Sequence, residues 1–195
     1  MFGTHAENLQ FWQRKQTNGK LFLAFQLIFF VGVPMPADID AKLEKWFEGA
    51  KKIVVAGIGN PIRQDDDVGL KVVESLQGRV RENVLLLECE TVPESYLLDL
   101  EQAKPSHVLL IDAAVLGLKP GESQLFEAEK IADFPAITSH VLPLRIFCSY
   151  IKESTRAKIG LLLIEPKCME FGEGLTVELQ AAVEYLAKLL LKVLS

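Results

Sequence analysis

The sequence predicts a single α/β domain built on a mostly parallel β-sheet with helices on both faces. Short runs rich in Val, Ile and Leu alternate along the chain with longer segments whose apolar residues recur at helical spacing. The chain has 195 residues, 49% of them hydrophobic. That is enough for one such domain with a core, and too little for two comfortable ones.

The first half of the domain alternates strand and helix. Residues 52–59 are apolar and β-branched and end in glycine, which predicts a buried strand. Residues 67–80 have apolar side chains at helical spacing and a glycine near their end, which predicts a helix. A second strand over 83–90, a helix over 94–103 and a third buried strand over 107–115 follow.

The second half continues the pattern. Residues 118–128 contain a Pro-Gly turn and then a shorter strand, and 142–155 are predicted to be helical. Residues 157–166 form an apolar strand halted by a proline. A long closing helix is predicted over 176–194, with Thr176 as its N-terminal cap.

Residues 1–34 do not resemble the rest of the chain. A polar stretch with basic residues precedes the apolar run 21–34, which is shorter than the ~20 residues of an ordinary membrane span. A signal or membrane anchor, a packed appendage, and an over-extended reading frame with the working protein starting at Met35 are the alternatives. We favour the last, because residues 35–52 read as a short helix leading into the first strand. The catalytic domain is therefore predicted over 35–195, with membrane contact expected only through 21–34.

Charge and cysteine content exclude several classes of protein. The net charge is -5 and no stripe of Lys and Arg is present, so nucleic acid is not an expected partner. The three cysteines are odd in number, widely spaced and without a CxxC pair, which argues against a disulfide framework or a zinc knuckle. A cytoplasmic protein is expected.

Polar residues follow the predicted strands where a ligand of an open parallel sheet would bind, beyond the carboxyl ends. The turn after the first strand, the end of the third strand and the loop before helix 142–155 supply them. We expect them to converge on one crevice. The candidates are Gly59, Asn60, Asp65, Asp66, Asp67, Asp112 and His140.

Each candidate also has a simpler explanation. Negative charge at 65–67 suits the start of a helix, Asp112 could cap a loop, and a lone histidine such as His140 is more often structural. A dinucleotide-binding turn requires a third glycine at position 62, but this chain has Ile62 there, which argues against a dinucleotide site. Taken together, two carboxylates and one imidazole favour a borderline divalent metal such as nickel or zinc, with positions left open for substrate.

Four motifs in order resemble the hydrogenase maturation endopeptidases, which remove a C-terminal extension from the large subunit of NiFe hydrogenases. They read GIGNPIRQDDDVG at 57–69, VLLIDAAV at 108–115, TSHVLPL at 138–144 and LLLIEP at 161–166. The likeness spans residues 52–194 and is greatest to the enzymes that act on energy-converting, membrane-bound hydrogenases. It implies a three-layer α/β/α sandwich around a twisted, mainly parallel sheet.

The resemblance also implies a site. Asp66, Asp112 and His140 would be the catalytic, metal-contacting positions, with Asp65 as a supporting neighbour. The metal would be nickel, recognised in the large-subunit precursor rather than held permanently, and zinc or cadmium could replace it in a crystal. Further contacts with the substrate are expected from Gly59, Asn60, Asp65, Glu90 and Thr91.

One segment departs from the family. Many relatives have a flexible Asp-Gly-Gly segment after the second strand, linked to substrate choice, whereas this chain reads ECETVPE at 88–94. We expect a stiffer loop there, with Thr91 still placed on the wall of the crevice.

The leading hypothesis is a nickel-dependent peptide hydrolase in which the ion polarises the scissile carbonyl or a water and Asp65 helps to handle protons. A scaffold or metallochaperone that binds the nickel-loaded precursor without cutting it would use the same ligands. A peptidyl-tRNA hydrolase shares the glycine turn, but it wants a histidine–asparagine pair where this chain has Asp66 and Asp67, and a basic surface.

Overall fold

The structure is a computed structural model that describes residues 39–128 and 141–195, and only the backbone over 141–145. The leader 1–34 and the candidate ligand His140 lie outside the described residues. Among the helices that are described, none combines the length and the apolar composition that crossing a membrane requires.

One sheet of five strands organises the described chain, in the order β2-β1-β3-β5-β4. The strands β2, β1, β3 and β5 are parallel, and β4 runs antiparallel to β5 at the edge. Their bounds are Ile53–Ile58 for β1, Val84–Glu90 for β2, His107–Ala113 for β3, Ser123–Glu127 for β4 and Lys158–Ile164 for β5. The predicted α/β fold with a mainly parallel sheet is confirmed.

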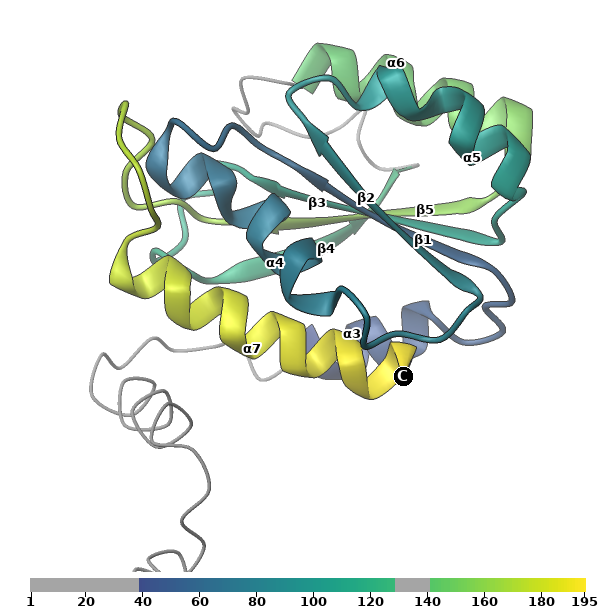
Figure 1. The fold of residues 1–195 in the computed structure, drawn as a ribbon, viewed down its shortest axis with the longest axis horizontal. Helices are drawn as coiled ribbons and strands as arrows, with labels where there is room; N and C mark the ends of the chain where they lie inside the picture. Colours follow the sequence, from purple (N-terminus) through teal and green to yellow (C-terminus); the bar gives the residue numbers. More distant parts are fainter. Residues whose placement is uncertain (1–38, 129–140) are drawn as a thin grey trace, which may run out of the picture. The chain divides into compact units, whose positions relative to one another are not determined.

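Helices cover both faces of this sheet, which gives the three layers seen in Figure 1. The helices α3, α4 and α7 lie on one face, and α5 and α6 lie on the other. Their bounds are Ile39–Trp46 for α3, Val68–Leu76 for α4, Leu97–Ala103 for α5, Val141–Thr155 for α6 and Val177–Leu194 for α7.

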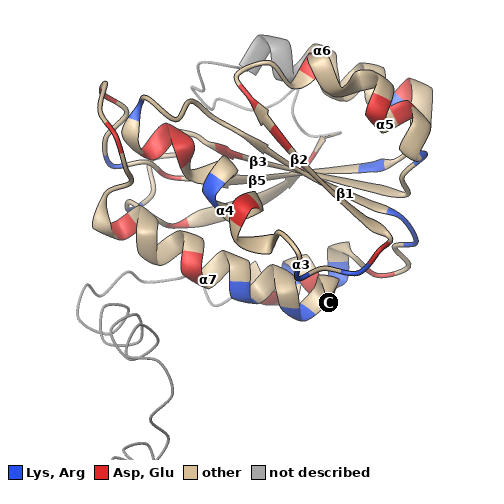
Figure 2. Ribbon diagram, viewed as in Figure 1, with Lys and Arg blue, Asp and Glu red and all other residues tan. Residues whose placement is uncertain are grey.

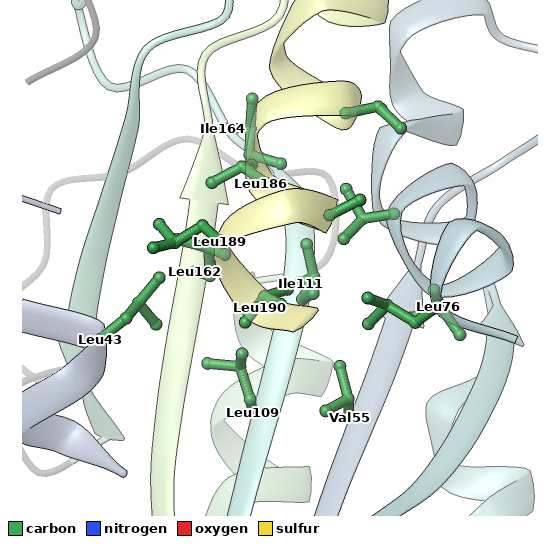
Figure 3. Close-up of a cluster of buried hydrophobic side chains, with 14 of the residues drawn as sticks. Leu43, Val55, Leu76, Leu109, Ile111, Leu162, Ile164, Leu186, Leu189 and Leu190 are labelled. Carbon is green, nitrogen blue, oxygen red and sulfur yellow. The ribbon is translucent and has the colours of Figure 1, made fainter. Parts of the chain in front are cut away.

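Two hydrophobic clusters, one on each face of the sheet, form the core. Successive strand residues point to opposite faces, so Val55 packs beneath α4 and α7 whereas its neighbour Val54 packs beneath α5 and α6. Figure 3 shows the first cluster, in which leucines of α7 such as Leu190 meet Leu109 and Ile111 of β3. Each fully buried side chain of this kind contributes about 1.5–3 kcal/mol relative to exposure. The packed core therefore holds the strands, and the residues at their ends, in fixed positions.

The structure corrects the start of two predicted helices and the role of a predicted cap residue. Short 3-10 turns, η1 over Gln64–Asp67 and η2 over Pro93–Tyr96, precede α4 and α5. Thr176 stands at the N-cap position of α7, as expected, but its side chain makes no capping bond. Its hydroxyl donates instead to Asp65, at 3.0 Å. Local propensity was overridden here by a buried carboxylate from a distant part of the chain.

Candidate active site

Glycines allow the turn after β1 to pack directly on the ends of the strands. A Cβ at Gly59 would lie 1.9 Å from the carbonyl oxygen of Asp66. A Cβ at Gly69 would lie 2.3 Å from the carbonyl oxygens of Ile58 and Ile111. Only glycine leaves room for this contact, so these two positions bring η1 and the start of α4 against the carboxyl ends of β1 and β3. Figure 2 shows the acidic turn in red at the start of α4.

Asp66 and Asp112 meet at this edge of the sheet. Asp66 comes from η1, Asp112 comes from β3, and these two elements contact each other. Both side chains are buried, and the charge of Asp66 acts on the carboxyl group of Asp112. The structure thus brings together two of the three predicted metal-contacting residues from positions 46 residues apart in the sequence.

The Asp112 carboxyl group is unusually hard to ionise. Burial, and after it the charge of Asp66, raises the pKa of Asp112 to about 8, against a small lowering by the backbone N–H of Ala113. That N–H donates to Oδ1 at 2.9 Å, whereas Oδ2 is buried and has no hydrogen-bond partner among the described residues. Two buried carboxylates that repel each other are stabilised when one of them binds a proton or when both bind a cation. The pair therefore fits a divalent metal ion, which would occupy the open lone pairs of Oδ2.

The third predicted ligand, His140, lies outside the described residues, directly before α6. Among the residues that are described, no group of three or more His, Cys, Asp or Glu side chains is close enough to hold a metal ion. The described part of the site supplies two carboxylates, so a complete ligand set needs at least one further donor from the chain or from a substrate.

Asp65 has a different role from Asp66. Its Oδ1 accepts the N–H of Thr176 at 2.7 Å, and its Oδ2 accepts the N–H groups of Lys167 and Cys168, both at 2.9 Å. With the Thr176 hydroxyl, this fully buried carboxylate accepts four hydrogen bonds. It ties the loop between β5 and α7 to η1.

Asp67 is the third buried aspartate of the turn. Burial raises its pKa, and the ammonium group of Lys71, 3.7 Å away on the next helical turn, opposes that rise. Its ion-pair partner therefore lies on α4.

The remaining predicted contacts surround the turn. Gly59 donates its N–H to the carbonyl of Glu90 at 3.0 Å, which joins the turn to the end of β2. Glu90 has a φ of 48°, in the left-handed region, and both Glu90 and Thr91 are exposed. Asn60 uses Oδ1 to accept the N–H of Ile62 at 3.2 Å, so it shapes the turn locally.

Sequence reasoning missed Glu165, a buried acid at the end of β5. Its Oε2 accepts the N–H groups of Leu116 and Leu118, at 2.6 and 3.1 Å, and so holds the loop that follows Asp112. The signal was available, because an acidic residue directly after LLLI stands at the carboxyl end of a buried strand, as Asp112 does.

The fold and the candidate site together define the structural class of the protein. The protein is a three-layer α/β protein whose binding edge, at the carboxyl ends of a parallel sheet, carries a buried pair of carboxylates.

Comparison with known proteins identifies the family. The sequence profile of the HycI family, described as hydrogenase maturation protease, matches residues 70–193. The crystal structure of a NiFe hydrogenase maturation protease, HycI from Thermococcus kodakarensis, superposes with a TM-score of 0.72 and 35% identity. It covers 78% of this chain and 97% of that one.

Two relatives found by sequence comparison are also described as hydrogenase maturation proteases. A Methanocaldococcus jannaschii protein, provisionally described as a hydrogenase maturation protease, is 35% identical over 64% of this chain and 78% of its own length. The hydrogenase 3 maturation protease of Escherichia coli is 27% identical over 67% of this chain and 83% of its own length. The chain belongs to the hydrogenase maturation protease family, as the resemblance predicted. It is a peptidase with a role in hydrogenase maturation.

Proposed function

We propose that this protein is a cytoplasmic endopeptidase that removes the C-terminal extension of a NiFe-hydrogenase large-subunit precursor after nickel insertion. The observation that carries the proposal is the buried pair of Asp66 and Asp112, in which Oδ2 of Asp112 has no hydrogen-bond partner among the described residues. Family membership supports the reaction class and the precursor as the partner.

In this proposal nickel belongs to the substrate. Asp66 and Asp112, with His140, contact the nickel that the precursor carries, and zinc or cadmium would replace it in a crystal. A bound divalent ion is a Lewis acid that polarises the scissile carbonyl or a water. A bound divalent ion would also offset the repulsion between the two carboxylates, and a nickel-free precursor would lack this favourable contact.

The neighbouring residues act on the peptide. The exposed side chains of Glu90 and Thr91 and the backbone of the turn at Gly59 and Asn60 supply contacts along the crevice. Because the Asp65 carboxylate already accepts four hydrogen bonds, we assign it to positioning rather than to the proton transfer that its sequence position favoured.

The test is to incubate the protein with nickel-loaded and nickel-free precursor and to follow the mass of the precursor C-terminus. Loss of the extension is expected only with nickel. The variants Asp66→Ala, Asp112→Ala and His140→Ala should each abolish the loss. Glu153→Ala, which removes an exposed acid of α6, is the matched control and should process as the wild type does.

Two outcomes would overturn the proposal. Wild-type rates in Asp66→Ala and His140→Ala would remove the metal-contacting assignment. Tight binding of the nickel-loaded precursor by the wild type without any cleavage would instead favour a scaffold or metallochaperone.

A further inference from the structure

A ribbon of two chain segments lies next to Asp66. Residues 60–64 follow β1, residues 168–172 lie between β5 and α7, and a parallel bridge joins Arg63 to Gly172. Backbone hydrogen bonds of 3.0 Å flank the bridge on both sides. Two segments more than 100 residues apart in the sequence thus form one surface unit. Along the chain, this unit is followed directly by Asp65 and by Asp66, the candidate metal-contacting residue.

The ribbon presents two large apolar side chains to solvent. Ile62 is 57% exposed and Phe171 is 76% exposed. Each precedes a bridged residue, so the register sets them side by side. Single exposed hydrophobic residues are normal on protein surfaces, but an adjacent pair contributes little to folding and suits a contact with another protein.

Arg63 holds Phe171 in this exposed position. Its guanidinium group donates two hydrogen bonds to the carbonyl of Met169, at 3.1 and 2.9 Å. Its Cζ also lies 5.5 Å from the centroid of the Phe171 ring, within cation–π range. An aromatic ring that is held in place before binding loses little conformational entropy when a partner covers it.

Asp65 fixes the ribbon from the protein interior. Its carboxylate accepts the N–H of Cys168, the first residue of the 168–172 segment, and those of Lys167 and Thr176 on either side of the segment. Its own N–H donates to the carbonyl of Cys168 at 3.1 Å. Because Asp65 adjoins Asp66, the same residue sets the distance between the exposed pair and the candidate ligand.

We propose that Ile62 and Phe171 are specificity-determining residues that contact the hydrogenase large-subunit precursor beside its cleavage site, and that Asp65 is the residue that positions them. This inference rests on the proposed function, since the precursor is the occupant. The 60–64 turn adjoins the candidate metal ligand, since the N–H of Asp66 donates to the carbonyl of Arg63 at 3.0 Å. Stable recognition of a folded protein needs a contact area far larger than a metal site, so a precursor that brings nickel to Asp66 is expected to contact this turn.

The test measures binding and cleavage separately. Nickel-loaded large-subunit precursor from the same organism is titrated calorimetrically into the wild type and into Ile62→Ala and Phe171→Ala, and cleavage is followed by mass. Each variant should raise the Kd by about tenfold or more, as truncation of an interface anchor does. The kcat should stay unchanged, since neither residue touches the reacting atoms. Tyr150→Ala, which removes a half-exposed aromatic of α6, is the matched control and should bind normally.

Asp65→Asn tests the positioning role. It keeps the shape of the side chain but replaces one acceptor oxygen with a donor, so the loop should shift, KM should rise and kcat should stay near the wild-type value. A merely structural role would lower the melting temperature and the active fraction and leave KM unchanged. If Asp65→Asn does not fold, Thr176→Val removes only the 3.0 Å hydroxyl bond and should raise KM less.

The results separate this inference from the proposed function. Normal binding by Ile62→Ala and Phe171→Ala, with a wild type that cleaves, overturns the inference alone. Binding that is lost in both variants, with a wild type that never cleaves, supports the inference and overturns the proposed function. A wild type that does not bind the precursor overturns both.

Discussion

Three adjacent aspartates have three different surroundings. Asp65 accepts hydrogen bonds from the loop before α7, Asp66 lies against Asp112, and Asp67 faces Lys71. All three are buried, so none is a solvated helix-start charge. Three like charges in a row are tolerated because each has its own environment, and this division of roles sets the chemistry of the turn.

Asp112→Asn should stabilise the metal-free protein at neutral and alkaline pH. The pKa of Asp112 is raised to about 8, so the folded state binds this proton more tightly than the unfolded chain does. Stability is therefore fully present below the unfolded pKa near 4, and it falls by about 1.4 kcal/mol per pH unit as pH rises toward the folded pKa. The asparagine variant lacks this loss.

The measurement is the difference in melting temperature between Asp112→Asn and wild type across pH 4 to 9. It should widen with pH and level off above about 8, while processing activity is lost. A difference that is constant over the whole range would show that Asp112 ionises normally.

At the scale of elements, the junction between η1 and α4 is set by close backbone contact. Gly69 lies within α4, where alanine would be favoured over glycine by about 1 kcal/mol. A Cβ there would lie 2.3 Å from two carbonyl oxygens at the strand ends, and backbone atoms cannot move aside cheaply. The cost of this steric clash should therefore exceed the gain in helix propensity from alanine.

Gly69→Ala is therefore predicted to destabilise the protein by about 1–3 kcal/mol or more, by chemical denaturation. It should also lower processing, because α4 must move off the sheet and carry Asp66 with it. Ser75→Ala, a partly buried position in the same helix, should be near neutral. Equal stability of Gly69→Ala and wild type would mean that the junction is looser than its geometry indicates.

At the scale of the whole molecule, the four motifs of the family resemblance and the residues that match the family profile, 70–193, all lie after Met35. A chain that begins at Met35 should therefore keep the fold and process the precursor at the full-length rate. Cleavage of the precursor and fractionation with vesicles, done on both lengths, check this. Loss of cleavage on truncation, or vesicle binding by the full-length chain alone, would give residues 1–34 a function.

Much of the architecture could be predicted from local pattern. Each strand was placed within a few residues, because buried parallel strands are short apolar runs with sharp polar borders. The rule that ligands bind at the carboxyl ends of strands placed the aspartates at 65–67 and Asp112 at one edge of the sheet, and the family motif singled out Asp66 among the three. The same rule, applied to the end of β5, would have found Glu165.

The sequence by itself determined the fold class, the family and the two candidate aspartates, because these depend on periodicity and on motifs that are local in the chain. Only the tertiary structure showed why Asp65 and Asp66 differ, since identical neighbouring residues differ only in what distant segments bring to them. It also joined Ile62 to Phe171 across more than 100 residues of chain. Contacts of that kind depend on how helices and strands pack, and no short stretch of sequence records them.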